Sequence, residues 1–231
     1  MRLSPDQLIF WQYGFIKLNA TLVFSWLVML VLVLTSFSLT RRLRSGLHPS
    51  RGQAMLEALI SFLNDQIEDA SQQPGKILLP FIGSLFLFIA LSNVLTIVPW
   101  YEPPTGSLST TAALALCVFL AVPYFGIAAR GLKDFLREYI QPNVIMLPFN
   151  IIGELSRTLS LAIRLFGNIM SGSVIIAILL AIAPLFFPII MQIFGLLIGV
   201  IQAYIFSILA VVFIASGSAK AKNSDERVAP T

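Results

Sequence analysis

The chain has 231 residues, of which 57% are hydrophobic and only 11% are charged, and its formal net charge at pH 7 is +4. No soluble fold of this length hides so much apolar surface, so the composition excludes a soluble protein and predicts an integral membrane protein. The basic residues lie at the ends of apolar segments rather than in one patch, which excludes a nucleic-acid-binding surface.

Four apolar blocks follow one another along the chain. Residues 18–39, 77–98 and 108–129 each have the length of about 20 residues that crosses a bilayer as one helix. The fourth block, residues 144–216, has room for two helices, and Pro184 and Pro188 predict a turn between them because proline removes a backbone donor. We therefore expect an all-α protein with five main hydrophobic helices, the last two of which are long, tilted and form a hairpin.

Short amphipathic segments lie between the apolar blocks. Residues 55–70 carry leucine and isoleucine at helical spacing, with acidic residues elsewhere on the helix. This pattern fits a helix on the membrane surface and equally a helix packed on a partner protein. Residues 132–140 form a second, shorter amphipathic piece.

The basic residues indicate the orientation. They cluster in residues 41–51, 130–137 and 220–222, which follow the first, third and fifth apolar helices. Because basic connections stay in the cytoplasm, the clusters predict a cytoplasmic C-terminus and an N-terminus outside. The chain then forms one integral membrane domain, residues 1–231, made of a first span with its basic end (1–50), an amphipathic connection (51–72), a helical hairpin (77–130), a long tilted hairpin (143–218) and a polar tail (219–231).

The predicted fourth helix is too long to stand upright in a bilayer. Residues 143–182 would extend over about 60 Å, about twice the thickness of the hydrocarbon core. The helix must therefore either tilt steeply or break near Pro148 or Gly153.

One face of this helix is polar and small. At 100° per residue, six polar or small residues all fall within about 60° of Arg164, namely Gly153, Arg157, Ser160, Gly167, Asn168 and Ser171. Glu154 lies three residues before Arg157, close enough to pair with it, whereas Arg164 has no acidic residue three or four positions away. An arginine at the bilayer centre costs about 2.5–3.5 kcal/mol on insertion scales, so an unpaired one indicates a functional site. Snorkelling from a helix end is the alternative, and it fits Arg157 better than Arg164.

The fifth helix carries Gly195, Gly199 and Gln202 on one face, with Gln192 at its edge. Glycines four residues apart allow close approach of another helix. A glutamine deep in an apolar helix needs hydrogen-bond partners, and we expect the polar face of the fourth helix to supply them.

Two stretches carry a resemblance to a known family. LSLAIRLFGN, residues 159–168, and IQAYIF, residues 201–206, closely resemble the a subunit of the membrane (Fo) sector of F-type ATP synthases. The similarity is sharpest over residues 148–216. It implies a stator protein whose two long helices cup a rotating ring of c subunits, each bearing an ion-binding carboxylate.

The resemblance also implies roles for individual residues. Arg164 would be the family's essential arginine, with Asn168 and Gln202 as its polar neighbours, while Gly167, Gly195 and Gly199 would serve helix packing. Two offset half-channels would couple ion flow to rotation, with H⁺ favoured and Na⁺ as the alternative. Ser173 and Gly195 stand where many bacterial relatives have a glutamate and a histidine. The candidates for half-channel or structural polar roles are Glu154, Arg157, Ser160, Ser171, Ser173 and Gln192.

The partners implied by the resemblance are the c-ring, b-type peripheral stalk subunits, the F1 sector indirectly and the lipid of a bacterial inner membrane. The chain has no glycine-rich phosphate loop, so we expect no catalysis by this chain alone, and we expect no cofactor or metal. A secondary transporter is the nearest alternative, but five spans do not divide into two repeats. A membrane anchor is the third interpretation, although anchors rarely keep a buried unpaired arginine.

Overall fold

The computed structural model describes residues 9–13, 16–41, 51–72, 74–98, 101–133, 146–182 and 187–219. Its helices are α1 (Ala20–Thr40), α2 (Arg51–Ser71), α3 (Leu79–Val94), α4 (Leu108–Arg130), α6 (Met146–Ile182) and α7 (Phe187–Ala219). Short 3₁₀ turns, η2 (Gly75–Ile77), η3 (Leu95–Ile97) and η4 (Pro104–Gly106), lie between them. All of these helices except α2 are long and apolar enough to cross a membrane, so the predicted five spans are confirmed.

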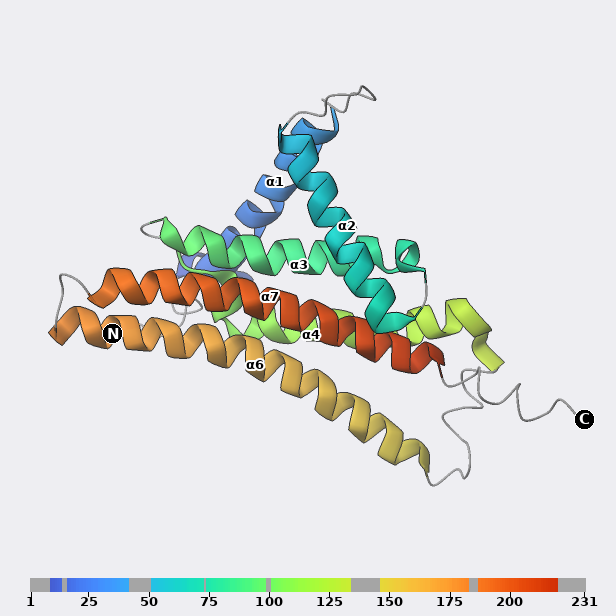
Figure 1. Cartoon of the computed structure of the whole chain (residues 1–231). Helices are drawn as coiled ribbons and strands as arrows, with labels where there is room; N and C mark the ends of the chain where they lie inside the picture. The colour runs from blue at the N-terminus through green and yellow to red at the C-terminus, as the bar shows by residue number, and fades with distance from the viewer. Residues whose placement is uncertain are drawn as a thin grey trace, which may run out of the picture.

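The fourth apolar block forms two long helices, as predicted. α6 has 37 residues and α7 has 33, and together they form a hairpin (Figure 1). α6 continues through Pro148 and Gly153, so a break at these residues is excluded. Pro148 is harmless because it lies in the first turn, where the backbone N–H groups have no partner within the helix. At 1.5 Å per residue α6 is about 54 Å long, and a rod of that length fits a hydrocarbon core of about 30 Å only at a steep tilt.

α7 lies at the centre of the fold. It contacts α2, α3, α4 and α6, and Figure 1 shows it running between α3 and α6. The buried core comes from all of these helices, with Leu63 and Ile67 from α2, Ile82 and Ile89 from α3, Val118 and Val122 from α4, Leu161 and Leu165 from α6, and Phe206, Val211 and Ile214 from α7. The turn expected between α6 and α7 falls on residues 183–186, outside the described residues, while Pro188 lies in the first turn of α7.

The amphipathic segment forms α2, and its buried face packs on this same chain. Leu63 and Ile67 are buried, and the Tyr204 hydroxyl of α7 donates a hydrogen bond to Gln66 Oε1. The rings of Phe62 and Tyr204 lie 6.1 Å apart. Helices α3 and α7 of this chain therefore cover the apolar face that was expected to lie on the membrane surface or on a partner protein. Of the second amphipathic piece, only residues 132 and 133 lie within the described part of the chain.

The structure adds a β-hairpin to the predicted helices. β1 (Ile9–Tyr13) and β2 (Ile16–Asn19) pair antiparallel, with Tyr13 opposite Ile16, and β2 leads directly into α1. Isoleucine and aromatic residues favour strands, which accounts for the hairpin. The hairpin lies before the first span. The prediction that the membrane-spanning part of the chain is all helical is therefore confirmed.

Candidate functional site

Arg164 lies at the midpoint of α6, 18 residues from either end, since the helix runs from residue 146 to residue 182. This corresponds to about 27 Å along the helix axis, farther than an arginine side chain can reach. The side chain is exposed on the surface of the chain and forms no ion pair with any described residue. Snorkelling to a helix end therefore does not account for Arg164.

Arg164 lines an open groove between α6 and α7, which we call the Arg164 groove. Its volume is about 290 Å³, and it is lined by Ser156, Arg157, Ser160, Leu161, Arg164, Leu209 and Phe213. No acidic side chain is among these described lining residues. Because Arg157 precedes Arg164 by seven residues, or about 10.5 Å of helix, the groove presents two fixed positive charges along one line.

The polar face of α6 points away from the chain's own core. Ser160, Arg164 and Gly167 are exposed, and Asn168 is half-buried. A Cβ atom added at Gly167 would meet no described atom within 4 Å. The adjoining side of the helix, with Leu161 and Leu165, is buried in the core. The exposed surface of α6 thus combines this polar face with apolar side chains such as Leu155, Leu159 and Ile163.

Ser171, on this face, and Ser173, on the opposite side of α6, both bond to their own helix. Ser171 Oγ donates to the Asn168 carbonyl at 3.1 Å, and Ser173 Oγ donates to the carbonyls of Ile169 and Met170, each at 3.0 Å. Such bonds satisfy the hydroxyl donors locally and leave oxygen lone pairs to accept a further hydrogen bond.

Gln202 on α7 is buried, with 6% of its surface exposed, and its Nε2 has no hydrogen-bond partner among the described residues. The polar face of α6 therefore does not supply the hydrogen bond expected for this amide. An unsatisfied buried amide donor costs about 1–3 kcal/mol, so this position favours the approach of an acceptor.

Gly199 packs against α3 through a residue that sequence reasoning missed. The Asn93 side chain donates from Nδ2 to the Gly199 carbonyl at 2.8 Å and accepts from Thr105 Oγ1 at 3.2 Å, so it joins α7, α3 and η4. A Cβ atom at Gly199 would lie 2.8 Å from the Asn93 Cβ, whereas one at Gly195 would meet nothing within 4 Å of the described structure. The sequence did contain a signal for this contact, because an asparagine inside an apolar span needs hydrogen-bond partners.

The connection between α3 and α4 docks on the same region. Gly106 of η4 approaches Ile169, the residue after Asn168. Tyr101 packs edge-on against Phe24 of α1, with ring centroids 5.1 Å apart, and burial raises the pKa of its hydroxyl above the usual value. Gln192 Nε2 donates to the carbonyl of Thr96 in η3 at 3.0 Å, so this end of α7 is held beside the end of α3.

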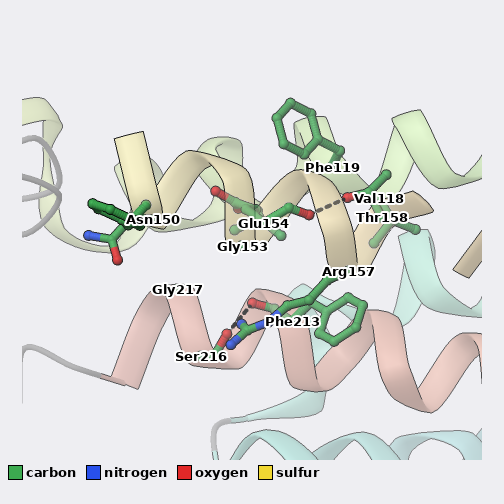
Figure 2. Close-up of a pocket in the computed structure, with 12 residues that line it drawn as sticks. Val118, Phe119, Asn150, Gly153, Glu154, Arg157, Thr158, Phe213, Ser216 and Gly217 are labelled. Atoms are coloured by element: carbon green, nitrogen blue, oxygen red, sulfur yellow. Dashed lines mark hydrogen bonds between the residues drawn. The ribbon is translucent and has the colours of Figure 1, made fainter. Parts of the chain in front are cut away.

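A second space, which we call the Glu154 cavity, lies between α4, α6 and α7 (Figure 2). Its volume is about 360 Å³, and it is lined by Val118, Phe119, Val122, Phe149, Asn150, Gly153, Glu154, Arg157, Thr158, Phe213, Ser216 and Gly217. Figure 2 shows Arg157 lying beside Phe213, and its guanidinium carbon is 5.9 Å from the ring centroid. The Ser216 hydroxyl bonds to the Phe213 carbonyl at 2.9 Å.

These features define a class of protein. A helical membrane protein that carries an exposed, permanently charged arginine at the centre of a span belongs with the proteins that move ions or charged groups across the bilayer.

Within the described residues no group of three or more histidine, cysteine, aspartate or glutamate side chains is placed to hold a metal ion.

The family model described as ATP synthase A chain matches residues 22–215, and the chain belongs to this family. It is therefore an a-type subunit of the Fo sector, an integral membrane component of a complex that serves ion transport in ATP synthesis. The resemblance inferred from residues 159–168 and 201–206 is thereby confirmed.

The curated relatives are similar over almost the whole chain. The chain is 61% identical over 218 residues to ATP synthase subunit a 2 of Acaryochloris marina, covering 94% of this chain and 93% of that protein. It is 61% identical over 217 residues to ATP synthase subunit a 1 of Crocosphaera subtropica, covering 94% of each. It is 58% identical over 226 residues to ATP synthase subunit a of Albidiferax ferrireducens, covering 98% of each.

Proposed function

We propose that this chain is the ion-translocating stator subunit of a rotary ATP synthase, in which Arg164 interacts in turn with the carboxylates of a c-subunit ring. The main support for this proposal is the position of Arg164, which is exposed at the centre of α6. The described residues that line its groove include no carboxylate. A cation at bilayer depth needs an anionic partner, and the described residues of this chain supply none, so we assign that partner to a neighbouring subunit.

The physics of a fixed charge accounts for the coupling. A guanidinium stays protonated, so it favours the ionised form of any carboxylate that comes near it and cannot itself relay a proton. It also opposes the direct passage of cations between the two sides of the membrane. Each ion that crosses at 100 mV exchanges about 2.3 kcal/mol with the field, and a leak would dissipate that energy.

The surroundings of Arg164 suit close contact with a ring helix. The open space at Gly167 lets a neighbouring backbone come near, and the exposed Gly195 offers the same on α7. Asn168 then acts as a polar neighbour of the ring carboxylate, and Gln202, which is buried within this chain, acts as a polar neighbour of Arg164. Helix contacts at small residues are the usual way for membrane helices to approach one another.

Polar residues lie on both sides of Arg164, as two offset half-channels require. Glu154, Arg157 and Ser160 lie toward the N-terminal end of α6. Ser171 and Ser173 lie toward its C-terminal end, where Gln192 of α7 is also found. We assign the first group to the half-channel that opens on the side of the α7 C-terminus and the second to the half-channel that opens on the opposite side.

Co-purification tests the assignment of partners. In mild detergent we expect this chain to be isolated together with a c-ring, b-type stalk subunits and, through them, the ATP-hydrolysing F1 sector. The basic clusters favour a C-terminus in the cytoplasm, and the bacterial relatives favour a bacterial inner membrane. Isolation of the chain without a c-ring, under conditions that keep other subunits bound, would contradict the proposal.

The transported ion is tested separately. We expect ATP-driven ion uptake by vesicles holding the complex to proceed without added Na⁺, because hydroxyl groups such as those of Ser171 and Ser173 support a hydrogen-bonded path for protons. Uptake of a pH-sensitive dye is the measurement, in Na⁺-free and Na⁺-containing buffers. Uptake that occurs only with Na⁺ would assign the complex to Na⁺.

A further inference from the structure

The Glu154 cavity and the Arg164 groove meet at one place. Of the described residues that line them, Arg157 and Phe213 are the two that both spaces share. They are also the two residues in contact with each other, with the guanidinium 5.9 Å from the ring centroid (Figure 2). The Arg157–Phe213 pair is therefore the boundary between the two spaces.

Both sides of this boundary are polar, although the surrounding helices are apolar. Glu154, Thr158 and Ser216 line the cavity, and Ser156 and Ser160 line the groove. The cavity also reaches Gly217, two residues before the end of α7 at residue 219, so it lies toward one end of the hairpin. Polar side chains at membrane depth are found where a protein lines a water-filled path.

The contact that divides the two spaces is weak compared with the contacts that a carboxylate can offer. A guanidinium on an aromatic face is held by attraction to the ring quadrupole, whereas a carboxylate provides a charge-assisted and often bidentate hydrogen bond. An anion entering the groove therefore draws the Arg157 side chain away from Phe213. Phe213 is packed against the buried core and stays in place, so the departure of the guanidinium is what opens the boundary.

We propose that the Glu154 cavity is the access chamber of one half-channel, and that the Arg157–Phe213 pair is the constriction through which ions pass between this chamber and the Arg164 groove. The proposal rests on the proposed function, since it takes the ring carboxylate as the anion in the groove. Arg157 closes the passage while the groove is empty and opens it when an ionised carboxylate arrives. Leakage between rotation steps is thereby reduced.

Cysteine accessibility in the assembled complex tests this constriction. Cys117 is the sole cysteine of the chain and is replaced by serine, and Ser160, which lines the groove and not the cavity, is replaced by cysteine. Vesicles are treated with a membrane-impermeant thiol reagent from the side of the α7 C-terminus. We expect Phe213→Ala to raise the labelling rate at position 160 by about tenfold. The substitution removes both the ring that blocks the path and one cation–π contact, whose free energy corresponds to a change of that order.

Phe119→Ala is the matched control, because Phe119 lines the cavity but not the boundary. We expect its labelling rate to stay close to that of the parent. Equal labelling in the parent, Phe119→Ala and Phe213→Ala would overturn the proposal, and so would an equal rise in both variants. If Phe213→Ala fails to assemble, Phe213→Leu keeps the bulk and removes the aromatic face, and we expect an intermediate rise.

Charge is tested at Arg157. We expect Arg157→Gln to raise the passive ion conductance of vesicles stripped of the F1 sector, and Arg157→Lys to restore the low conductance because it keeps the cation. Unchanged conductance in Arg157→Gln would overturn the role of the charge. If transport is unaffected by Arg164→Ala, the proposed function fails. If Arg164→Ala abolishes transport but Phe213→Ala leaves the labelling rate at position 160 unchanged, the proposed function stands and only the proposed constriction is refuted.

Discussion

Arg164→Ala is expected to abolish both ATP-driven ion transport and ion-driven ATP synthesis, while the complex still assembles. Arg164 is exposed and lies outside the buried core, so the loss of its side chain leaves the packing of α6 on α7 intact. What disappears is the only fixed charge at the midpoint of this helix. Without it, a ring carboxylate has no cation to favour its ionised form, and the barrier to direct ion flow is lost.

The measurement compares ATP-driven acidification of vesicles with passive ion conductance after removal of the F1 sector. We expect coupled transport to fall to background and passive conductance to rise. Arg41→Ala is the control, since Arg41 is also an exposed arginine, but it lies directly after the first span. Full coupled transport in Arg164→Ala would refute the assignment.

Gly199→Ala is expected to destabilise the packing of α7 on α3. The added Cβ would lie 2.8 Å from the Cβ of Asn93, and both atoms are fixed to helix backbones, so the helices must separate. Overpacking of this kind costs about 1–3 kcal/mol, and separation also weakens the hydrogen bond from Asn93 to the Gly199 carbonyl. We expect a lower midpoint of thermal unfolding in detergent.

The same substitution one helical turn earlier provides the control. Gly195 has open space around it within the described structure, so Gly195→Ala should leave the unfolding midpoint of the isolated chain unchanged or slightly raised by its better helix propensity. Asn93→Gly combined with Gly199→Ala should recover part of the loss, because it removes the clashing Cβ. Equal midpoints for the two single alanine variants would contradict the proposed contact.

Most of the fold was predictable because each span is encoded locally. Apolar blocks of span length fix the number of helices, and the 3.6-residue period placed Arg164 and Gly167 on one face, where both are exposed. The sequence left open whether α6 breaks at Pro148, since the effect of a proline depends on its distance from the helix start. The structure resolves this, because α6 begins at Met146.

The contacts between helices were less predictable, since the period of one helix does not state which neighbour each face meets. Gln202 was expected to bond with α6, yet its Nε2 is unpaired among the described residues, and Gly199 meets Asn93 of α3. Asn93 itself lay unremarked in an apolar span. The β-hairpin carries a local signal in the aromatic and isoleucine residues of β1, but this signal is only five residues long and lies outside the apolar spans.

The most direct test of the central claim is disulfide cross-linking between this chain and the c-ring in the purified complex. The account predicts that cysteines at Ser160, Gly167 and Ser171, on the exposed polar face of α6, form cross-links with cysteines placed beside the ring carboxylate. A cysteine at Ala162, which is buried toward the chain's own core, should form none. Cross-links from position 162 in place of positions 160, 167 and 171 would show that the Arg164 face does not meet the ring.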